Sequence, residues 1–150
     1  MIRSLPNMTL SLNDLISIFI HQTDLELTGY IKNKLLPFNI APEQNLIMML
    51  LWEKDGLSQN EVACKLDKDK TNIARMAFGL EQKGFVKRIN CPKDRRVQRL
   101  YLTKEGLELK EHIIPIANQF NSLLCQNITN DELKQIRQIL CKMRANLRNS

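Results

Sequence analysis

The pattern of residues 57–106 restricts the fold more than any other feature of the chain, because its hydrophobic spacing changes once, from helix to strand. Ser58 and Glu61 form a capping box at the start of one short helix. A second helix follows the acidic turn at 67–69, where an aspartate can cap it, and ends at Gly84. Two short helices joined by a tight connection predict a helix-turn-helix.

Two short strands follow this pair of helices. Residues 85–89 and 97–102 have strand patterns, and the polar loop between them, 90–96, is basic. The hairpin is therefore of the wing type. The order of elements predicts a mainly α fold with a small β-hairpin wing (α+β), in which residues 38–106 form a winged helix-turn-helix core.

Apolar stripes at helical spacing predict two helices before this segment. The first stripe runs from Leu12 to Leu35 and ends near Pro37. The second helix opens at Pro42 and stops before Gly56. It is apolar nearly all round, so we expect it to be buried.

The C-terminal part of the chain predicts two further helices. Thr103 caps the first, Pro115 should bend it, and a second capping box, Thr129 with Glu132, opens the last helix. The last helix carries a narrow apolar seam, Leu133, Ile136, Leu140, Met143 and Leu147. Such a seam needs one partner helix, which the first helix, the fifth helix or a second copy of the chain can supply.

A lone winged domain cannot cover the apolar stripes of the first and last helices. We therefore expect a homodimer. In this interpretation the chain is one domain, 1–150, and residues 1–37 and 107–150 are its dimerisation helices.

The net charge of +6 is concentrated in the middle third of the chain. Residues 1–56 carry 4 basic and 6 acidic side chains, residues 57–106 carry 12 and 6, and residues 107–150 carry 6 and 4. A major groove about 12 Å wide admits one α-helix, and the phosphates beside it need cationic partners. The helix pair with its basic hairpin therefore indicates a protein that binds double-stranded DNA.

The fourth helix presents the residues that could contact this DNA. Its side away from the apolar stripe carries Lys70, Thr71, Asn72, Ala74, Arg75 and Phe78. Arg75 is the favoured reader of a base edge, and Lys70 is expected to anchor a phosphate. The alternative is a solvated helix face that happens to contain one arginine.

Three segments carry a resemblance to a known family, in the family's order and spacing. They are Leu80-Glu81-Gln82-Lys83-Gly84-Phe85-Val86, Asp94-Arg95-Arg96 and Leu102-Thr103-Lys104-Glu105-Gly106. Residues 57–107, about a third of the chain, resemble the winged-helix core of the MarR family of transcriptional regulators. The resemblance implies a homodimer whose recognition helices enter successive major grooves of a pseudo-palindromic operator, and repression that a small ligand or oxidation relieves.

The resemblance also implies that wing arginines reach the minor grooves. We expect Arg96 to enter the groove, Arg95 to contact a phosphate, and Asp94 to hold the loop by accepting hydrogen bonds. The alternative is a mobile basic loop that touches phosphates without preference. The expected DNA-binding residues are Ser58, Lys70, Thr71, Asn72, Arg75, Arg95 and Arg96.

Three residues depart from the family pattern. Lys68 stands where the family usually has an apolar residue, so the turn before the fourth helix could pack in another way. Phe78 and Gly79 replace a polar pair, and Gly79 should weaken the helix by about 1 kcal/mol relative to alanine. Phe78 could touch thymine methyl groups or pack under the wing.

The four cysteines lie far apart, and neither histidine has metal-ligand spacing from one of them, so we expect no disulfide and no metal site. Cys91, in the wing loop, is expected to be the most exposed, and nearby Lys87, Arg88 and Lys93 could lower its pKa and make it a redox-sensitive thiol. An unreactive thiol is the alternative. The other three look like small core residues: Cys64, Cys125 and Cys141.

Other functions have less support. The sequence has no phosphate loop, nucleophile elbow, paired-carboxylate pattern or HExxH motif, so we expect neither an enzyme nor a cofactor. The longest apolar stretch, 46–52, has 7 residues, and no signal-peptide pattern is present, which favours the cytoplasm over a membrane. An aromatic and methionine cluster could line an inducer pocket but is more typical of core: Tyr30, Phe38, Met48, Met49, Trp52 and Phe120. A protein-interaction adaptor on a winged-helix scaffold is the main alternative to a DNA-binding regulator.

Overall fold

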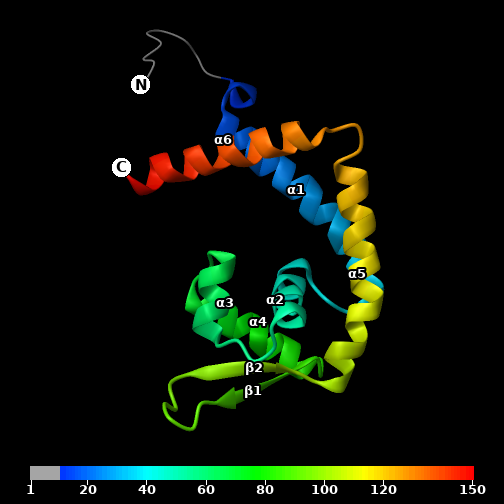
Figure 1. The fold of residues 1–150 in the computed structure, drawn as a ribbon, viewed down its shortest axis with the longest axis vertical. Coiled ribbons are helices and arrows are strands. Elements are labelled where there is room, and N and C mark those ends of the chain that lie inside the picture. Colours follow the sequence, from blue (N-terminus) through cyan, green and yellow to red (C-terminus); the bar gives the residue numbers. More distant parts are fainter. Residues whose placement is uncertain (1–10) are drawn as a thin grey trace. The chain divides into compact units, whose positions relative to one another are not determined.

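The computed structural model describes residues 11–150. The chain divides into two compact units after Ile113, inside helix α5 (Lys104–Leu124). Within the described residues, the first unit contains two 3₁₀ turns, η1 (Leu12–Asp14) and η2 (Leu36–Phe38), and the helices α1 (Ile16–Leu35), α2 (Pro42–Glu53), α3 (Gln59–Leu66) and α4 (Lys70–Gln82). It also contains the strands β1 (Val86–Asn90) and β2 (Gln98–Leu102) and the first half of α5. The second unit holds the rest of α5 and helix α6 (Asn130–Arg148), and Figure 1 shows this order.

The mainly α fold with a two-stranded wing is therefore confirmed. The first helix differs from its prediction, because α1 begins at Ile16 and not at Leu12. Ser11 caps a separate 3₁₀ turn, and the extended backbone of Leu15 separates that turn from α1. No helix of residues 11–150 is long and apolar enough to cross a lipid bilayer.

Side chains that accept backbone N–H groups set the starts of α3, α5 and α6. Ser58 Oγ accepts the N–H of Glu61 at 3.0 Å, and Thr103 Oγ1 accepts that of Gly106 at 3.0 Å. Thr129 and Glu132 form the full predicted capping box at the start of α6. The box predicted at Ser58 is only half formed, because the carboxylate of Glu61 lies 3.6 Å from Arg99.

The end of α4 turns the chain into the wing. Gly84 has a φ of +83°, which places it in the left-handed region. The N–H of Phe85 donates to the carbonyl of Leu80 and that of Gly84 to the carbonyl of Glu81, both at 3.0 Å. These two bonds form a Schellman motif, so the predicted stop at Gly84 is confirmed.

The hairpin pairs β1 with β2 in antiparallel register, from Val86 opposite Leu102 to Asn90 opposite Gln98. The N–H of Leu100 on β2 also donates to the carbonyl of Leu57 at 2.8 Å. The segment before α3 is therefore joined to the sheet, and the two predicted strands are held against the helix-turn-helix.

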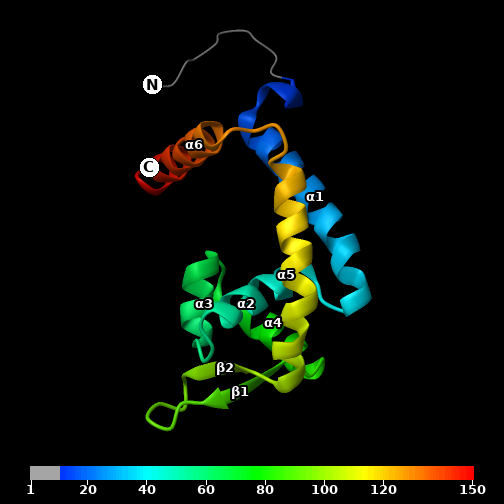
Figure 2. The same cartoon turned by 45° about the vertical axis from the view of Figure 1, so that its right-hand side comes forward.

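The core of the first unit lies among α2, α4, the hairpin and the first half of α5, which Figure 2 shows from a second side. Its largest fully buried side chains are Leu35, Ile47, Met48, Leu51, Leu57, Ile73, Leu80, Leu100, Ile113, Val62 and Val86. Gly106 lies against the carbonyl of Phe85, where a Cβ would not fit, and its own carbonyl accepts the indole N–H of Trp52 at 2.9 Å. Helix α2 is buried on one side only, since Leu46 is 43% exposed, so the prediction of full burial was wrong.

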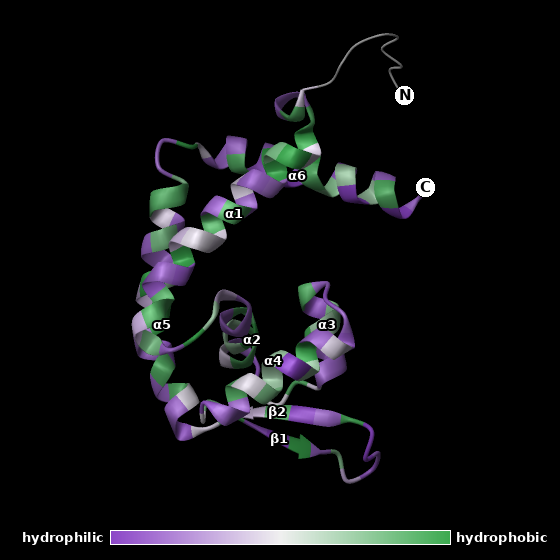
Figure 3. Cartoon of the chain, turned by 180° about the vertical axis from the view of Figure 1, so that it is seen from behind, coloured by the Kyte–Doolittle hydropathy of each residue, from purple (hydrophilic) through white to green (hydrophobic). Residues whose placement is uncertain are grey.

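Helix α6 has no buried residue. Its apolar side chains Ile136, Ile139 and Leu147 are 50% exposed or more, and Figure 3 shows apolar residues along this helix. The division after Ile113 also differs from the predicted boundary at 106/107. The assignment of one domain with dimerisation helices stays a prediction.

The cysteines do not lie where they were predicted. Cys64 and Cys141 are exposed and Cys125 is half-buried, so their assignment to the core was wrong. Helix α3 buries Val62 and Ala63, while Cys64 lies about 100° further round the helix from Ala63. Cys141 lies on α6, which buries nothing.

Candidate nucleic-acid interface

Helix α4 has a buried apolar side and an exposed side that is mostly polar. Ile73, Met76, Ala77 and Leu80 are buried, whereas Lys70, Thr71, Arg75 and Phe78 are exposed and Asn72 is half-buried. The apolar stripe holds the helix in the core, and the opposite side remains open to a ligand.

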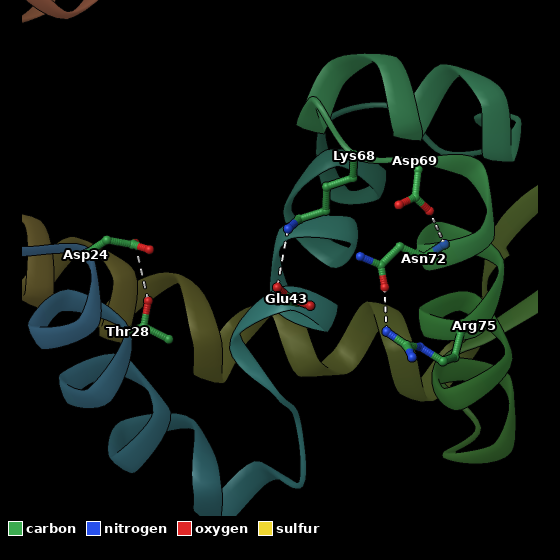
Figure 4. Close-up of polar contacts among 7 residues, drawn as sticks. All are labelled: Asp24, Thr28, Glu43, Lys68, Asp69, Asn72 and Arg75. Carbon is green, nitrogen blue, oxygen red and sulfur yellow. Dashed lines mark hydrogen bonds and ion pairs between the residues drawn. The ribbon is translucent and has the colours of Figure 1, made fainter. Parts of the chain in front are cut away.

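The polar side of α4 is ordered by a short chain of hydrogen bonds, shown in Figure 4. Asp69 Oδ1 accepts the N–H of Asn72 at 2.7 Å and caps the helix. The Oδ1 of Asn72 accepts from Arg75 Nη2 at 2.5 Å. The guanidinium of Arg75 is therefore oriented by its own helix while its remaining donors face solvent.

The wing loop is organised around Asp94. Its Oδ1 accepts the N–H of Arg96 at 3.0 Å and lies 4.0 Å from Arg96 Nε. The side chain of Arg96 is nonetheless 96% exposed. Arg95 is exposed beside it. Asp94 thus holds the backbone of the loop while both arginines point into solvent.

A polar hollow of about 140 Å³ lies between the start of α3 and this loop, lined by Ser58, Gln59, Asn60, Arg95, Arg96, Val97 and Gln98. Gln59 Nε2 donates to Gln98 Oε1 at 2.7 Å, which ties α3 to the wing beside the hollow. Ser58 itself is 5% exposed and its hydroxyl already caps α3. Its side chain therefore caps α3, and the predicted DNA contact of Ser58 stays a prediction.

Comparison with known proteins supports the interpretation of this geometry. The sequence model described as the MarR family matches residues 40–97. Over 100 residues the chain is 32% identical to the HTH-type transcriptional regulator PapX of Escherichia coli, which covers 67% of this chain and 61% of PapX. It is 28% identical over 131 residues to the organic hydroperoxide resistance transcriptional regulator of Bacillus subtilis, covering 87% of this chain and 88% of that relative.

The similarity extends to the three-dimensional structure. The chain matches Staphylococcus aureus MepR, taken from a MepR–DNA complex, with a TM-score of 0.82 and 26% identity, covering 89% of this chain and 98% of MepR. The chain belongs to the MarR family. The resemblance inferred from the three sequence segments is thereby confirmed. The chain spans less than two thirds of the length of PapX.

Four cationic side chains of the MarR-family core form ion pairs or hydrogen bonds within the protein, which the sequence did not reveal. Arg88 is paired with Glu81 at 3.0 Å, and Arg99 Nη1 donates to the carbonyl of Gly56 at 2.9 Å. Lys68 is paired with Glu43 at 3.3 Å (Figure 4). Lys83 Nζ donates to Gln44 Oε1 at 2.7 Å, and burial lowers the pKa of Lys83.

These contacts also explain two of the departures from the MarR-family pattern. Lys68 replaces an apolar residue and uses its charge to join the turn before α4 to Glu43 of α2. A Cβ on Gly79 would lie 2.7 Å from Gln44 Nε2. Gly79 therefore leaves room for the side chain of Gln44, which caps α2 and accepts from Lys83.

Cys91 has a lowered pKa, in the predicted direction but for a different reason. The backbone N–H groups of Lys93 and Asp94 have the largest effect on this pKa, and the charge of Arg99 adds a smaller one. The thiol is half-buried and less exposed than Cys64 and Cys141, so the prediction that it is the most exposed cysteine was wrong. Its redox role stays a prediction.

The proposed pocket residues of the first unit take part in packing. Phe38 stacks on His112 with ring centroids 5.4 Å apart, Met48 is fully buried, and Trp52 donates to the carbonyl of Gly106. These contacts favour the interpretation of this cluster as core.

Proposed function

We propose that this chain is a sequence-specific, double-stranded DNA-binding transcriptional regulator that acts as a repressor. The observation that carries the proposal is Arg75, exposed on α4 and oriented by Asn72 beside a basic wing. The relative from S. aureus forms a DNA complex with the same fold, and PapX is named a transcriptional regulator.

Helix α4 is the recognition helix in this proposal. Arg75 reads a base edge, Thr71 and Asn72 contact bases or phosphates nearby, and Lys70 anchors a phosphate at the start of the helix. The exposure of Lys70, Thr71 and Arg75 supports these roles.

The wing contributes contacts outside the bases that α4 reads. Arg96 enters a minor groove and Arg95 binds the neighbouring phosphate, while Asp94 holds the loop through the N–H of Arg96. The hollow beside α3 supports a phosphate close to Arg95, because the first N–H groups of a helix favour anions. Ser58 contributes by capping that helix.

The regulator acts as a homodimer on a pseudo-palindromic operator in the cytoplasm and has no enzymatic activity. The exposed apolar residues of α6 support dimerisation, since such a surface is usually covered by a partner. Release by a small ligand or by oxidation belongs to the proposal because a B. subtilis relative is named for organic hydroperoxide resistance.

Selection of duplexes from a random pool by the purified protein tests the function directly. We expect enrichment of two-fold symmetric sites whose half-sites lie about 10 bp apart. Affinity for the selected duplex should fall steeply with salt, since several cations per subunit displace counterions. Failure to enrich any sequence would leave the protein-interaction adaptor as the better interpretation.

The wing assignment is tested on selected duplexes whose flanks are A·T-rich or G·C-rich. Wild type should prefer A·T-rich flanks, and Arg96→Ala should lose that preference, because narrow A·T-rich minor grooves attract arginine. Lys93→Ala removes another cation of the same loop and is the control. It should weaken binding to both duplexes equally. An Arg96→Ala protein with full flank preference would refute the minor-groove role.

A further inference from the structure

Arg88 is the most constrained arginine of the wing. It lies in the middle of β1, on the side of the strand that carries buried Val86, whereas Lys87 and Ile89 point the other way. Its guanidinium donates to Glu81 Oε1 through Nε at 3.2 Å and Nη2 at 3.0 Å. Its backbone N–H donates to the other oxygen, Glu81 Oε2, at 3.1 Å.

One carboxylate on α4 thus holds both the backbone and the side chain of a residue on β1. The side chains of Arg88 and Glu81 are only 22% and 32% exposed. The hydrogen bonds from Arg88 also lower the pKa of Glu81, which keeps it ionised. The charge of Arg88 is therefore used inside the protein.

Phe78 completes this arrangement from the same side of α4, three residues before Glu81. The guanidinium carbon of Arg88 lies 5.4 Å from the centre of the Phe78 ring, a distance typical of a cation–π contact. Phe78 is 49% exposed, so its other side remains open. These contacts favour packing of Phe78 under the wing over contact with thymine methyl groups.

We propose that Phe78, Glu81 and Arg88 form a clamp that sets the position of the wing relative to the recognition helix. The clamp rests on the proposed DNA-binding function and assigns Arg88 as a positioning residue for Arg96, not as a phosphate contact. Phe78 departs from the MarR-family pattern at this position, so the family pattern does not predict the aromatic part of the clamp.

Glu81→Gln distinguishes a positioning role of Arg88 from a purely electrostatic one, because the two roles predict different changes in DNA binding. The change removes a negative charge near the DNA, so a purely electrostatic role for Arg88 predicts tighter binding to every duplex. The clamp predicts that the wing loses its position. Preference for A·T-rich over G·C-rich flanks should then fall about fivefold, the scale of one ordinary hydrogen bond.

Glu43→Gln is the matched control, because it also removes a carboxylate from an ion pair, with Lys68, but does not contact the wing. It should leave the flank preference of the wild type unchanged. Arg88→Lys keeps the charge but loses the two-point contact, and it should behave like Glu81→Gln. Binding to each duplex is measured at a temperature where the melting curve of every variant shows a folded protein.

Amide hydrogen exchange tests the clamp without DNA. The N–H of Arg88 should exchange about fivefold faster in Glu81→Gln than in Glu43→Gln, because only the former removes its acceptor charge. Faster exchange with lost flank preference supports the clamp. Unchanged exchange, or tighter binding with full flank preference, overturns it. If wild type binds no DNA at all, the proposed function fails, and the exchange rates still decide whether the clamp exists.

Discussion

Helices α4 and α6 follow the same local rules but end in opposite environments. Each is capped by a side-chain oxygen, from Asp69 and Thr129 respectively, and each carries an amphipathic stripe. The stripe of α4 is buried by its own chain, so its polar side can serve as a binding surface. The stripe of α6 is not buried, although its spacing is as regular. The difference shows that amphipathic spacing predicts a helix but not what covers it.

The largest effect should come from a charge placed in the seam of α6. Leu140→Asp should raise the dimer dissociation constant roughly 100-fold or more, because burying an unpaired carboxylate costs several kcal/mol. Sedimentation over a range of protein concentrations measures it. Gln138→Asp, on the opposite side of α6, is the control and should remain dimeric. If the wild type sediments as a stable monomer at micromolar concentration, a second copy of the chain does not cover the stripe of α6.

Shortening a buried side chain in the apolar stripe of α4 should have the next largest effect. Leu80 is fully buried, so Leu80→Ala should lower the free energy of unfolding by about 2–5 kcal/mol through lost burial and a residual cavity. Urea unfolding measures this change, and Thr71→Ala on the exposed side should alter it by less than about 0.5 kcal/mol. A loss below about 1 kcal/mol for Leu80→Ala would mean that the stripe is not tightly packed.

The exposed sides of the two helices should differ in DNA binding. Arg75→Ala on α4 should cost about 1–3 kcal/mol on the selected duplex and relax preference at one base position per half-site. Lys70→Ala should weaken binding to all DNA sequences about equally, and Arg137→Ala on α6 should change DNA affinity little. Fluorescence anisotropy on selected and random duplexes compares them. Equal losses on both duplexes for Arg75→Ala would make Arg75 a phosphate contact.

The smallest effect concerns pH and two glutamates, one on each helix. Hydrogen bonds from Arg88 hold the pKa of Glu81 below its usual value of 4.5, and Thr129 does the same for the pKa of Glu132. A pKa lowered by folding adds stability that is complete above the usual value and is lost as the pH falls through the folded pKa. The pH profile of urea unfolding should therefore flatten below about pH 4.5 in Glu81→Gln.

Glu132→Gln should flatten that profile less, because Glu132 is fully exposed and solvent screens its interactions. Parallel profiles for wild type and Glu81→Gln would show that the Arg88 contact adds no stability at neutral pH. The comparison of the two variants indicates whether the partly buried contact of α4 is worth more than the exposed cap of α6.

Most of the fold could be predicted from the sequence. The caps at Ser58, Thr103 and Thr129 and the stop at Gly84 are local hydrogen-bonding features, so residues near in sequence are enough to identify them. The first helix began later than predicted because Leu15 is extended.

The candidate site was predicted less completely. Arg75 and the wing arginines are exposed where the sequence predicts, but Ser58 is buried as a cap, and the sequence does not decide what Phe78 contacts. Cys64 and Cys141 were placed in the core because small apolar residues often lie there, and their actual exposure depends on which helix side is covered.

The sequence by itself determined the order of the elements, the ends of the helices and the basic character of the middle third, since all of these depend on neighbouring residues and composition. Only the tertiary structure decided which cations remain available to a partner. Arg88 and Glu81 are seven residues apart on opposite sides of the turn at Gly84, and Lys68 and Glu43 are 25 apart. Such pairs form because packing brings distant segments together, and no local pattern encodes that distance.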